Sequence, residues 1–447
     1  MTRSLAQWID YIQTLHSRTI DLGLERVAQV WERFRPEALP PVIAVAGTNG
    51  KGSSVAMLES IYRGAGYRTG AFTSPHLVHF NERIRLDNVP VGDRLLLDSF
   101  RRIEAVRGDV PLTFFEFNTL LALDIFSAAP LDVILLEVGL GGRLDAVNIV
   151  DNDLALITAI SIDHQAWLGD DREQIGREKA GIIKPSGRLV IADPEVPQSV
   201  PETARAQQAD FVEAGRDFRV LEMTEFGNES QSAPPGPQGD SEPGIAPRHC
   251  FSSTHTVLRR YNGFEFIPAQ AHVHHNMAGV VASVAMLADR LPVDETQLKA
   301  GLEGYSIRGR LQLIEGAPRI LLDVSHNEAS VLTMLEYIDS LQVSGRIHAV
   351  FGALADKDYG AAYQALQQRV AHWYLTSLHG PRGQSAQELG EQLFGSGFAA
   401  DTRPDVFIFN TPLNAYNQAR LHSDPDDLVV IFGSFHLVGG ILPHLEQ

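Results

Sequence analysis

The segment from Val42 to Ser53 constrains the fold of this chain more than any other stretch. Five apolar residues, Val42–Ala46, form a run typical of a buried parallel strand, and a glycine-rich stretch at 47–52 follows it directly. Residues 53–65 then carry apolar side chains at helical spacing. A strand, a glycine loop and a helix in this order predict the start of a βαβ unit.

The same stretch contains the residue types that hold a phosphate. In a glycine loop, consecutive backbone N–H groups can turn toward an anion, and the following helix presents its positive end to the same point. Lys51 would add a positive charge, and the Ser53 hydroxyl can reach a magnesium ion. The pattern departs from G-x-x-x-x-G-K-[ST], since Val45 stands at the first glycine position and Gly52 separates Lys51 from Ser53. The alternative is a glycine-rich turn that binds no ligand. The lysine between glycines, directly after a buried strand, argues against this alternative.

Apolar runs of strand length recur along the chain in two series. The first series comprises residues 42–46, 132–137, 154–158 and 188–192, and the second comprises residues 319–324, 347–351, 373–376 and 428–432. Other patterns predict helices near residues 5–12, 24–34 and 276–291, and a β-rich stretch at 257–267. Strands alternating with helices predict an α/β fold with mostly parallel, doubly wound sheets.

The two series suggest two domains in the 447-residue chain. We expect the boundary between residues 304 and 310, giving domains at 1–306 and 307–447. Residues 227–247 hold five prolines, four glycines and three serines, a composition that predicts a mobile surface loop.

Charge and cysteine content narrow the classes of partner. The chain has 37 Lys and Arg against 55 Asp and Glu, a net charge of −18, which argues against a broad nucleic-acid or anionic-membrane surface. Anionic small molecules remain possible, because they need only a local cluster of donors. The chain has a single cysteine, and it shows neither a signal-peptide pattern nor an apolar run of about 18 residues. These features together predict a cytoplasmic protein.

Polar residues at the ends of predicted strands indicate a metal site near the glycine loop. Glu137 ends the first-series run that begins at Asp132, where a carboxylate would emerge beside the loop and could serve as a magnesium ligand. A surface acid at a strand end is the alternative reading. The glycine-rich stretch 139–145 follows Glu137 along the chain. His164 comes after the next predicted strand and is a second candidate metal ligand, and the alternative is that it has only a structural role.

Several motifs in a fixed order extend these observations over nearly the whole chain. They are Gly47-Thr-Asn-Gly-Lys-Gly-Ser53, Thr73-Ser-Pro-His-Leu77, Leu136-Glu-Val-Gly-Leu-Gly-Gly-Arg-Leu-Asp145, Asp163-His164, Arg177-Glu-Lys-Ala-Gly-Ile182, Gly309-Arg310-Leu-Gln312, Asp323-Val-Ser-His-Asn327, Asp356-Lys-Asp358 and Gly433-Ser-Phe435. The set resembles the folylpolyglutamate synthase/dihydrofolate synthase family, a branch of the Mur ligase superfamily. The stretch Asp21-Leu-Gly-Leu-Glu-Arg-Val27 further resembles the pteroate-binding segment of the bacterial bifunctional members.

The resemblance implies an ATP-dependent amide ligase. Its N-terminal domain would be P-loop NTPase-like and bind ATP and pteroate, and its smaller C-terminal ligase domain would be Rossmann-like. The implied reaction joins L-glutamate to 7,8-dihydropteroate through an acyl phosphate and gives dihydrofolate. The second implied activity adds glutamates to tetrahydrofolate through the γ-carboxylate. ATP is then a co-substrate, magnesium the cofactor, expected as two ions, and the chain a monomer.

The resemblance also assigns residues. It gives ATP contacts to Thr48, Asn49, Gly50, Lys51, Gly52, Ser53, Asn276, Arg310 and Asp323. It gives metal ligation to Ser53, Ser74, Glu137 and His164, and the pteroate pocket to Asp21, Leu22, Gly23, Leu24, Thr113, Leu144, Asp145 and Ala146. His326 and Ser434 would lie on the glutamate side, and Lys51, Lys179, His164 and Arg310 would act in catalysis. Lys179 would be carbamylated, with a salt-bridged helix lysine, paired to Glu178 or Asp163, as the alternative.

Three residues depart from the family pattern, and other functions stay open at this point. Glu328 follows Asn327 where a proline is usual, Arg308 precedes Gly309 in place of proline, and Val147 replaces a threonine. These departures affect local geometry and remove no expected ligand. The alternatives are an enzyme with the folylpolyglutamate synthase activity only, another Mur-type ligase, and a P-loop regulatory ATPase.

Overall fold

The chain separates into two compact units in a computed structural model. The structure describes residues 3–223, 248–267, 273–355, 357, 360–380, 382–400 and 403–446. Unit 1 comprises Met1–Ser74 and Asn81–Ser306, and unit 2 comprises Pro75–Phe80 and Ile307–Gln447. The loop predicted at 227–247 lies outside the described residues, as do Asp356 and Asp358.

Unit 1 is built on an eight-stranded sheet with the order β4-β3-β2-β5-β1-β6-β7-β8. Its strands are β1 (Val42–Ala46), β2 (Thr69–Phe72), β3 (Ile84–Leu86), β4 (Val89–Pro90), β5 (Val133–Glu137), β6 (Leu154–Ile157), β7 (Arg188–Ile191) and β8 (Asp210–Glu213). In this order, all neighbouring strands from β2 across the sheet to β8 pair in parallel. The pairs β4-β3 and β3-β2 at the opposite edge are antiparallel. The central strand β1 therefore lies between β5 and β6, so all three carboxyl ends meet beside the glycine loop.

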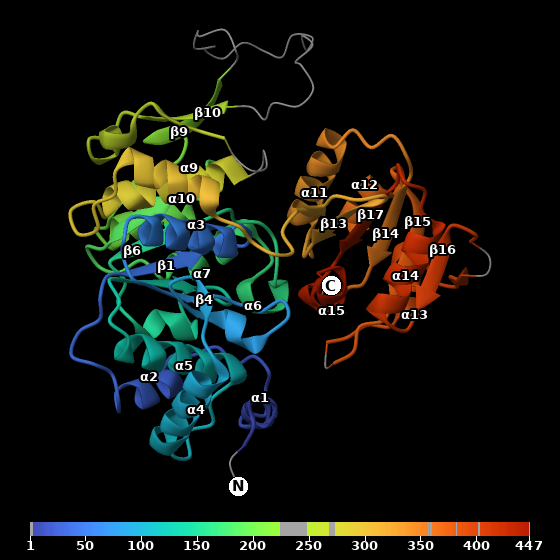
Figure 1. The fold of residues 1–447 in the computed structure, drawn as a ribbon. Helices are drawn as coiled ribbons and strands as arrows, with labels where there is room; N and C mark the ends of the chain where they lie inside the picture. Colours follow the sequence, from blue (N-terminus) through green and yellow to red (C-terminus); the bar gives the residue numbers. More distant parts are fainter. Residues whose placement is uncertain are drawn as a thin grey trace. The chain divides into compact units, whose positions relative to one another are not determined.

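Helices cover both faces of this sheet (Figure 1). They are α1 (Leu5–Thr14), α2 (Glu25–Trp31), α3 (Lys51–Gly64), α4 (Asp93–Arg107), α5 (Phe114–Ala128), α6 (Gln165–Leu168), α7 (Arg172–Ala180), α8 (Ser199–Ala206), α9 (His274–Met286) and α10 (Glu295–Gly304), with 3₁₀ helices η1 (Phe80–Arg83), η2 (Ala146–Ile149) and η3 (Val257–Tyr261). One face packs against α3, α9 and α10, which share an apolar core with the sheet. Helices α2, α4 and α5 lie on the opposite side.

A small antiparallel sheet completes unit 1. It has the order β11-β10-β9 and consists of β9 (Phe218–Met223), β10 (Arg248–Ser253) and β11 (Phe264–Phe266). Phe251, Phe264 and Phe266 bury their rings in the same core as α9. This sheet thus extends the covering layer that holds α9 against the main sheet.

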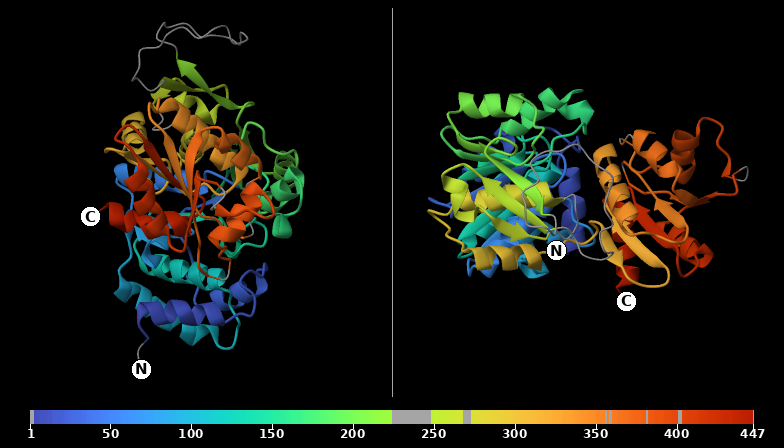
Figure 2. Two further views of the ribbon diagram at one scale, coloured as in Figure 1. Left: turned by 90° about the vertical axis from the view of Figure 1, so that its right-hand side faces the viewer. Right: turned by 90° about the horizontal axis from the view of Figure 1, so that it is seen from above.

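Unit 2 contains a six-stranded sheet with the order β12-β13-β17-β14-β15-β16. The strands are β12 (Gln312–Ile314), β13 (Arg319–Asp323), β14 (Ile347–Phe351), β15 (Val370–Thr376), β16 (Val406–Phe409) and β17 (Leu428–Phe432), and the helices are α11 (Glu328–Ser340), α12 (Gly360–Gln367), α13 (Ala386–Phe394), α14 (Pro412–His422) and α15 (Phe435–Leu445). All pairings are parallel except that of β12 with β13. One apolar core joins the sheet to α11, α12 and α13, and a second joins it to α14 and α15. Figure 2 shows this sheet in orange to red with helices on both faces.

A short segment from the N-terminal part of the sequence belongs to unit 2. Pro75–Phe80 clusters with it, and Leu77 and Val78 pack against the core that contains α15. A Cβ atom at Gly439 would lie 1.9 Å from the carbonyl oxygen of Leu77, so only glycine permits this approach. The chain therefore enters unit 2 directly after Ser74 and returns to unit 1 at Asn81.

The predicted α/β class with two series of parallel strands is confirmed, while several local predictions are wrong. All eight predicted strands are present, although the pattern missed β2, β3, β4, β8, β12 and β16, and β9 and β10 of the small antiparallel sheet. Residues 257–267, expected to be β-rich, hold the 3₁₀ helix η3 and only the short strand β11, because Leu258 and Tyr261 point into the core at helical spacing. Helix α9 ends at Met286, five residues before the predicted end. None of the helices in the described ranges is both long enough and apolar enough to cross a membrane.

Candidate active site

The glycine loop lies between β1 and α3, where the sequence predicted a phosphate site. Gly47 has φ 156° and Gly50 has φ 91°, so both adopt a backbone conformation that favours glycine. The Thr48 N–H donates to the Ala159 carbonyl at 2.7 Å, and the Thr158 hydroxyl donates to the Asn49 carbonyl at 2.8 Å. These bonds fix the loop to the end of β6, and α3 begins directly after it, so the positive end of this helix lies at the loop.

Two lysines converge on the start of the loop. Lys51 Nζ donates to the carbonyls of Gly47 and Thr48 at 3.0 and 3.1 Å, and Lys179 Nζ donates to Gly47 at 2.9 Å. Lys179 is buried on α7, and burial, reinforced by Lys51, lowers its pKa to about 7. Of its two predicted alternative partners, Glu178 forms an ion pair with Arg143 instead, while the negative charge of Asp163 opposes the lowering of the Lys179 pKa. A neutral amine at Lys179 is therefore accessible near pH 7.

Glu137 is the last residue of β5 and faces the loop from the neighbouring strand. The parallel register aligns Glu137 with Val45, and both carboxylate oxygens lie 3.7 Å from where a Cβ of Gly52 would be. The side chain is buried, and its Oε2 accepts the Ser74 N–H at 3.1 Å. The structure thus brings Ser74, Glu137 and the start of α3, which carries Ser53, into one place.

His164, the fourth predicted metal ligand, directly precedes α6 and has φ 53°. Its N–H donates to Asp163 Oδ1 at 2.8 Å, and its Nε2 lies 3.9 Å from Asp163 Oδ2. Across the described ranges no three His, Cys, Asp or Glu side chains form a group able to hold a metal ion. The predicted set differs from such a group, because it combines Glu137 and His164 with two serine hydroxyls.

Asn276, a predicted ATP contact, lies against the glycine loop. A Cβ at Gly50 would be 2.5 Å from Asn276 Oδ1, so glycine is required for this approach. The residue belongs to the first turn of α9, whose buried apolar stripe anchors the helix on the sheet. Asn276, which the resemblance assigns to ATP, thus lies beside the glycine loop.

The three segments predicted to line the pteroate pocket come together around α2 and α5. Thr113 caps α5 and forms a reciprocal capping box with Glu116. Arg26 on α2 pairs with both Glu116 and Asp21 at 3.1 and 2.7 Å. The helix η2, which starts at Ala146, packs against both α2 and α5. Residues 22–24 connect Asp21 to the start of α2.

Asp145 holds the loop after β5 in shape. Its buried carboxylate accepts the N–H groups of Gly139, Leu140 and Val147 at 3.1, 2.9 and 2.9 Å. Burial raises its pKa to about 6, and these N–H groups oppose the rise. The carboxylate therefore orders the backbone beside Leu144 and Ala146.

In unit 2, the predicted residues lie at the carboxyl ends of β13 and β17. Asp323 accepts the N–H groups of Leu311 and Ser325, each at 2.7 Å, and burial raises its pKa while Arg310 opposes the rise. The Arg310 guanidinium lies 5.3 Å from the centre of the Phe435 ring. His326 lies 6.2 Å from the same ring, and Ser434 caps α15. The carboxyl ends of these strands in the unit 2 sheet thus bring together Arg310, Asp323, His326 and Ser434.

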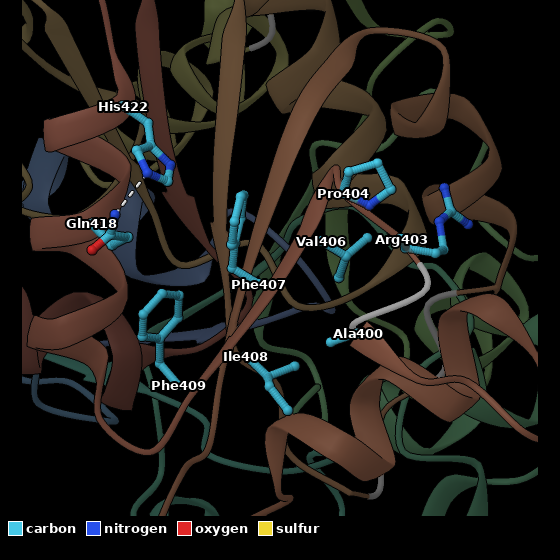
Figure 3. Close-up of a pocket in the computed structure, with 9 residues that line it drawn as sticks. All are labelled: Ala400, Arg403, Pro404, Val406, Phe407, Ile408, Phe409, Gln418 and His422. Atoms are coloured by element: carbon cyan, nitrogen blue, oxygen red, sulfur yellow. Dashed lines mark hydrogen bonds between the residues drawn. The ribbon is translucent and has the colours of Figure 1, made fainter.

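A cavity of about 590 Å³ in unit 2 contains none of the predicted site residues (Figure 3). It follows the edge strand β16, and its lining residues are Ala400, Arg403, Pro404, Val406, Phe407, Ile408, Phe409, Gln418 and His422. The Arg403 guanidinium in this lining is paired with Asp405 at 2.8 Å. These described lining residues include neither a glycine loop nor a carboxylate for a metal, which sets the cavity apart from the phosphate site of unit 1.

Sequence reasoning missed buried charged residues around the pteroate segments. Arg83 is buried with its guanidinium 5.4 Å from the centre of the Phe114 ring, and burial lowers its pKa to about 10. Glu116 is buried beside Arg26. The capping-box spacing from Thr113 to Glu116 was a usable signal for Glu116, and Arg26 lies within the Asp21–Val27 stretch that resembles the pteroate-binding segment, whereas no local pattern marks Arg83.

Comparisons with known proteins point to one family. Residues 309–435 match the family model described as Mur ligase, glutamate ligase domain. The dihydrofolate synthase/folylpolyglutamate synthase of Escherichia coli K12 is 38% identical over 443 residues, covering 99% of this chain and 96% of the relative. The solved structure of E. coli FolC in complex with DHPP and ADP superposes with a TM-score of 0.85 at 36% identity, covering 99% and 98% of the two chains. The solved structure of a bifunctional folylpolyglutamate synthase/dihydrofolate synthase with Mn, AMPPNP and L-glutamate bound superposes with a TM-score of 0.82 at 36% identity. The match covers 100% of this chain and 99% of that chain.

Identity of 38% over 99% of this chain and 96% of the relative resolves the family assignment. The chain belongs to the dihydrofolate synthase/folylpolyglutamate synthase family.

Proposed function

We propose that this protein is an ATP-dependent ligase that joins L-glutamate to 7,8-dihydropteroate and adds further glutamates to tetrahydrofolate through the γ-carboxylate. The observation that carries the proposal is the glycine loop of unit 1, with Lys51 across it and the Glu137 carboxylate facing Gly52. The family relatives support it, since one is bound to DHPP and ADP and another to Mn, AMPPNP and L-glutamate.

The chemistry explains why such a ligase needs ATP. A carboxylate is a poor acyl donor, because its leaving group would be oxide. In the proposed first step a carboxylate oxygen of dihydropteroate attacks the γ-phosphorus, and the bond to ADP breaks. The glutamate amine then attacks the acyl carbon of this acyl phosphate and inorganic phosphate leaves. Both steps require charge neutralisation and in-line placement rather than a protein nucleophile.

The residues of unit 1 fit the first step. The backbone N–H groups of residues 50–53, at the N-terminus of α3, would hold the triphosphate, and Lys51 would neutralise its charge. Magnesium would be held by Ser53, Ser74, Glu137 and His164. The buried Glu137 carboxylate and the two serine hydroxyls supply the oxygen donors that a hard cation prefers. The metal would supply charge neutralisation on the transferred phosphoryl group.

The remaining predicted residues complete the proposal. Unit 1 would bind ATP and pteroate, the latter through Asp21–Leu24, Thr113 and Leu144–Ala146. Unit 2 would supply Arg310 and Asp323 to ATP, and His326 and Ser434 to glutamate. The monomeric state, the cytoplasmic location and the second activity on tetrahydrofolate stay predictions.

Lys179 is proposed to be carbamylated. A neutral amine must attack carbon dioxide, and the lowering of the Lys179 pKa to about 7 makes that amine available. The product is an anion, so it replaces a second ammonium beside Lys51 by an oxygen ligand for metal. We expect ¹³C-bicarbonate to produce a carbamate carbon signal in the protein that is absent from the Lys179→Ala variant. Identical spectra for the two proteins would show that this lysine is unmodified.

Phosphate release from ATP tests the ligase assignment against a regulatory ATPase. A ligase releases phosphate only when dihydropteroate and glutamate are both present, because the acyl phosphate forms on one and is consumed by the other. The measurement omits each substrate in turn with magnesium and ATP held constant. Release that ignores both substrates would contradict the ligase and favour a nucleotide-driven switch.

A further inference from the structure

Arg26 joins two parts of the chain that are far apart in sequence. It is the second residue of α2, and its guanidinium reaches the segment before α2 and the N-terminus of α5 together. In Figure 1 these two helices lie side by side below the main sheet of unit 1, and contacts between them agree.

The contacts on the α2 side hold the backbone as well as the carboxylate of Asp21. Arg26 Nη2 donates to the Asp21 carbonyl at 2.7 Å, and Nη1 lies 2.7 Å from Asp21 Oδ2. Side chains on a helix tilt toward its N-terminus, so Arg26 reaches back over the preceding turn. Leu24, the residue before α2, makes no capping hydrogen bond through its side chain. Arg26 therefore supplies a side-chain anchor for the Asp21–Leu24 segment that the helix cap does not provide.

The contacts on the α5 side reach a buried carboxylate. Arg26 Nε donates to Glu116 Oε2 at 3.4 Å, and Nη2 lies 3.1 Å from Glu116 Oε1. Only 4% of the Glu116 side chain is exposed, and its Oε2 also accepts the Thr113 N–H at 2.7 Å. One guanidinium thus ties the Asp21 segment to the helix cap formed by Thr113.

We propose that Arg26 is a positioning residue that pre-forms the pocket for the pteridine-bearing substrate. This inference rests on the proposed function, in which Asp21–Leu24 and Thr113 line that pocket. Arg26 acts through Asp21 and Glu116, so its loss would leave the substrate to order the Asp21 segment on binding. The ordering cost then weakens binding and leaves the chemical step unchanged.

Arginine suits this role because its planar fork donates in several directions at once. A lysine presents one compact charge and reaches Glu116 or Asp21, but does not span both. Arg26→Lys keeps a cation beside the buried Glu116 and so preserves stability, whereas Arg26→Ala leaves that carboxylate without this partner. The two variants together separate positioning from folding.

Arg18 provides a matched control. It pairs with the same Asp21 carboxylate at 3.2 Å, but 73% of its side chain is exposed. An exposed pair of this kind contributes little. Arg18→Ala therefore removes a cation from Asp21 without cutting the link from Asp21 to Glu116.

The test is steady-state kinetics with dihydropteroate, ATP and glutamate varied in turn. We expect Arg26→Ala to raise KM for dihydropteroate about tenfold or more, from the loss of hydrogen bonds to charged groups, with kcat and KM for ATP within about twofold. Arg26→Lys should raise the same KM by an intermediate factor with an unchanged melting temperature, and Arg18→Ala should match the parent. If Arg26→Ala fails to fold, the Arg26→Lys values decide.

Two results would overturn the inference: a dihydropteroate KM in Arg26→Lys equal to that of the parent, or equal rises in KM for dihydropteroate and ATP. The latter would indicate general loosening of unit 1. Failure of the proposed function is distinguishable, because the parent protein itself would then not convert dihydropteroate.

Discussion

Replacing Lys51 by alanine is expected to lower kcat/KM for ligation by at least about 10²-fold, because its charge acts where negative charge is transferred between two anions. The amine is held over the glycine loop by the carbonyls of Gly47 and Thr48. Alanine is a strong helix former at this first position of α3, so the fold should survive. The measurement is the rate of dihydropteroate-dependent phosphate release, with circular dichroism and thermal unfolding as checks on folding.

Lys299→Ala is the control for the loss of a lysine. Lys299 lies on α10 with its side chain 57% exposed and pairs with Glu303 one turn away. Its removal should leave kcat/KM within about twofold of the parent. Activity of Lys51→Ala within a few-fold of the parent would remove the phosphate role from this lysine.

The Glu137→Gln variant is expected to lose ligation by at least about 10²-fold, comparable to the loss of one group that stabilises transition-state charge. The amide keeps the shape of the side chain and an oxygen that can accept the Ser74 N–H, so the local hydrogen bond is preserved. It removes the negative charge that a magnesium ion requires from this site. The variant therefore separates metal binding from folding.

A magnesium titration gives the sharper readout for Glu137. We expect the magnesium concentration for half-maximal rate to rise in Glu137→Gln and in Glu137→Ala alike. Asp151→Ala is a suitable control, since the side chain of this aspartate is 97% exposed and pairs with Lys184 at 3.4 Å. An unchanged magnesium dependence, with a rate near that of the parent, would move the metal away from Glu137.

The parts of the fold that could be predicted from sequence are those that depend on local pattern. Buried parallel strands read as continuous apolar runs, so β1, β5, β6 and β7 can be recognised from the order of their residues alone. The glycine loop was also predictable, because a φ of 91° at Gly50 demands glycine and the glycines are visible in the sequence directly after a buried strand. Local pattern failed at η3, where core packing of Leu258 and Tyr261 selects a helical turn over a strand.

Features that depend on contacts between distant segments could not be predicted. The transfer of Pro75–Phe80 into unit 2 depends on the fit of Leu77 against Gly309 and Gly439, which are more than 200 residues away along the chain. The lowering of the Lys179 pKa likewise arises from burial beside Lys51. The motifs that carry the resemblance include Leu77, Gly309 and Lys179, but only the folded chain supplies the physical reason for their behaviour.

The active-site features also account for the acidic composition. A net charge of −18 is compatible with anionic substrates only if the positive charge is local. In the proposed site, Lys51 and the N-terminus of α3 would provide it in unit 1, and Arg310 would provide it in unit 2 beside Phe435. Under this proposal, acceptance of ATP, glutamate and pteroate is a property of these positions rather than of the whole surface.

In the proposed reaction, ATP activates the carboxylate of dihydropteroate as an acyl phosphate. The most direct measurement carries out the phosphate-release reaction with ¹⁸O in both carboxylate oxygens of dihydropteroate and determines the isotope content of the product by mass spectrometry. We expect one ¹⁸O atom in each phosphate released, because the carboxylate oxygen that attacks phosphorus leaves with it. Phosphate free of ¹⁸O, with ligated product still formed, would exclude an acyl phosphate.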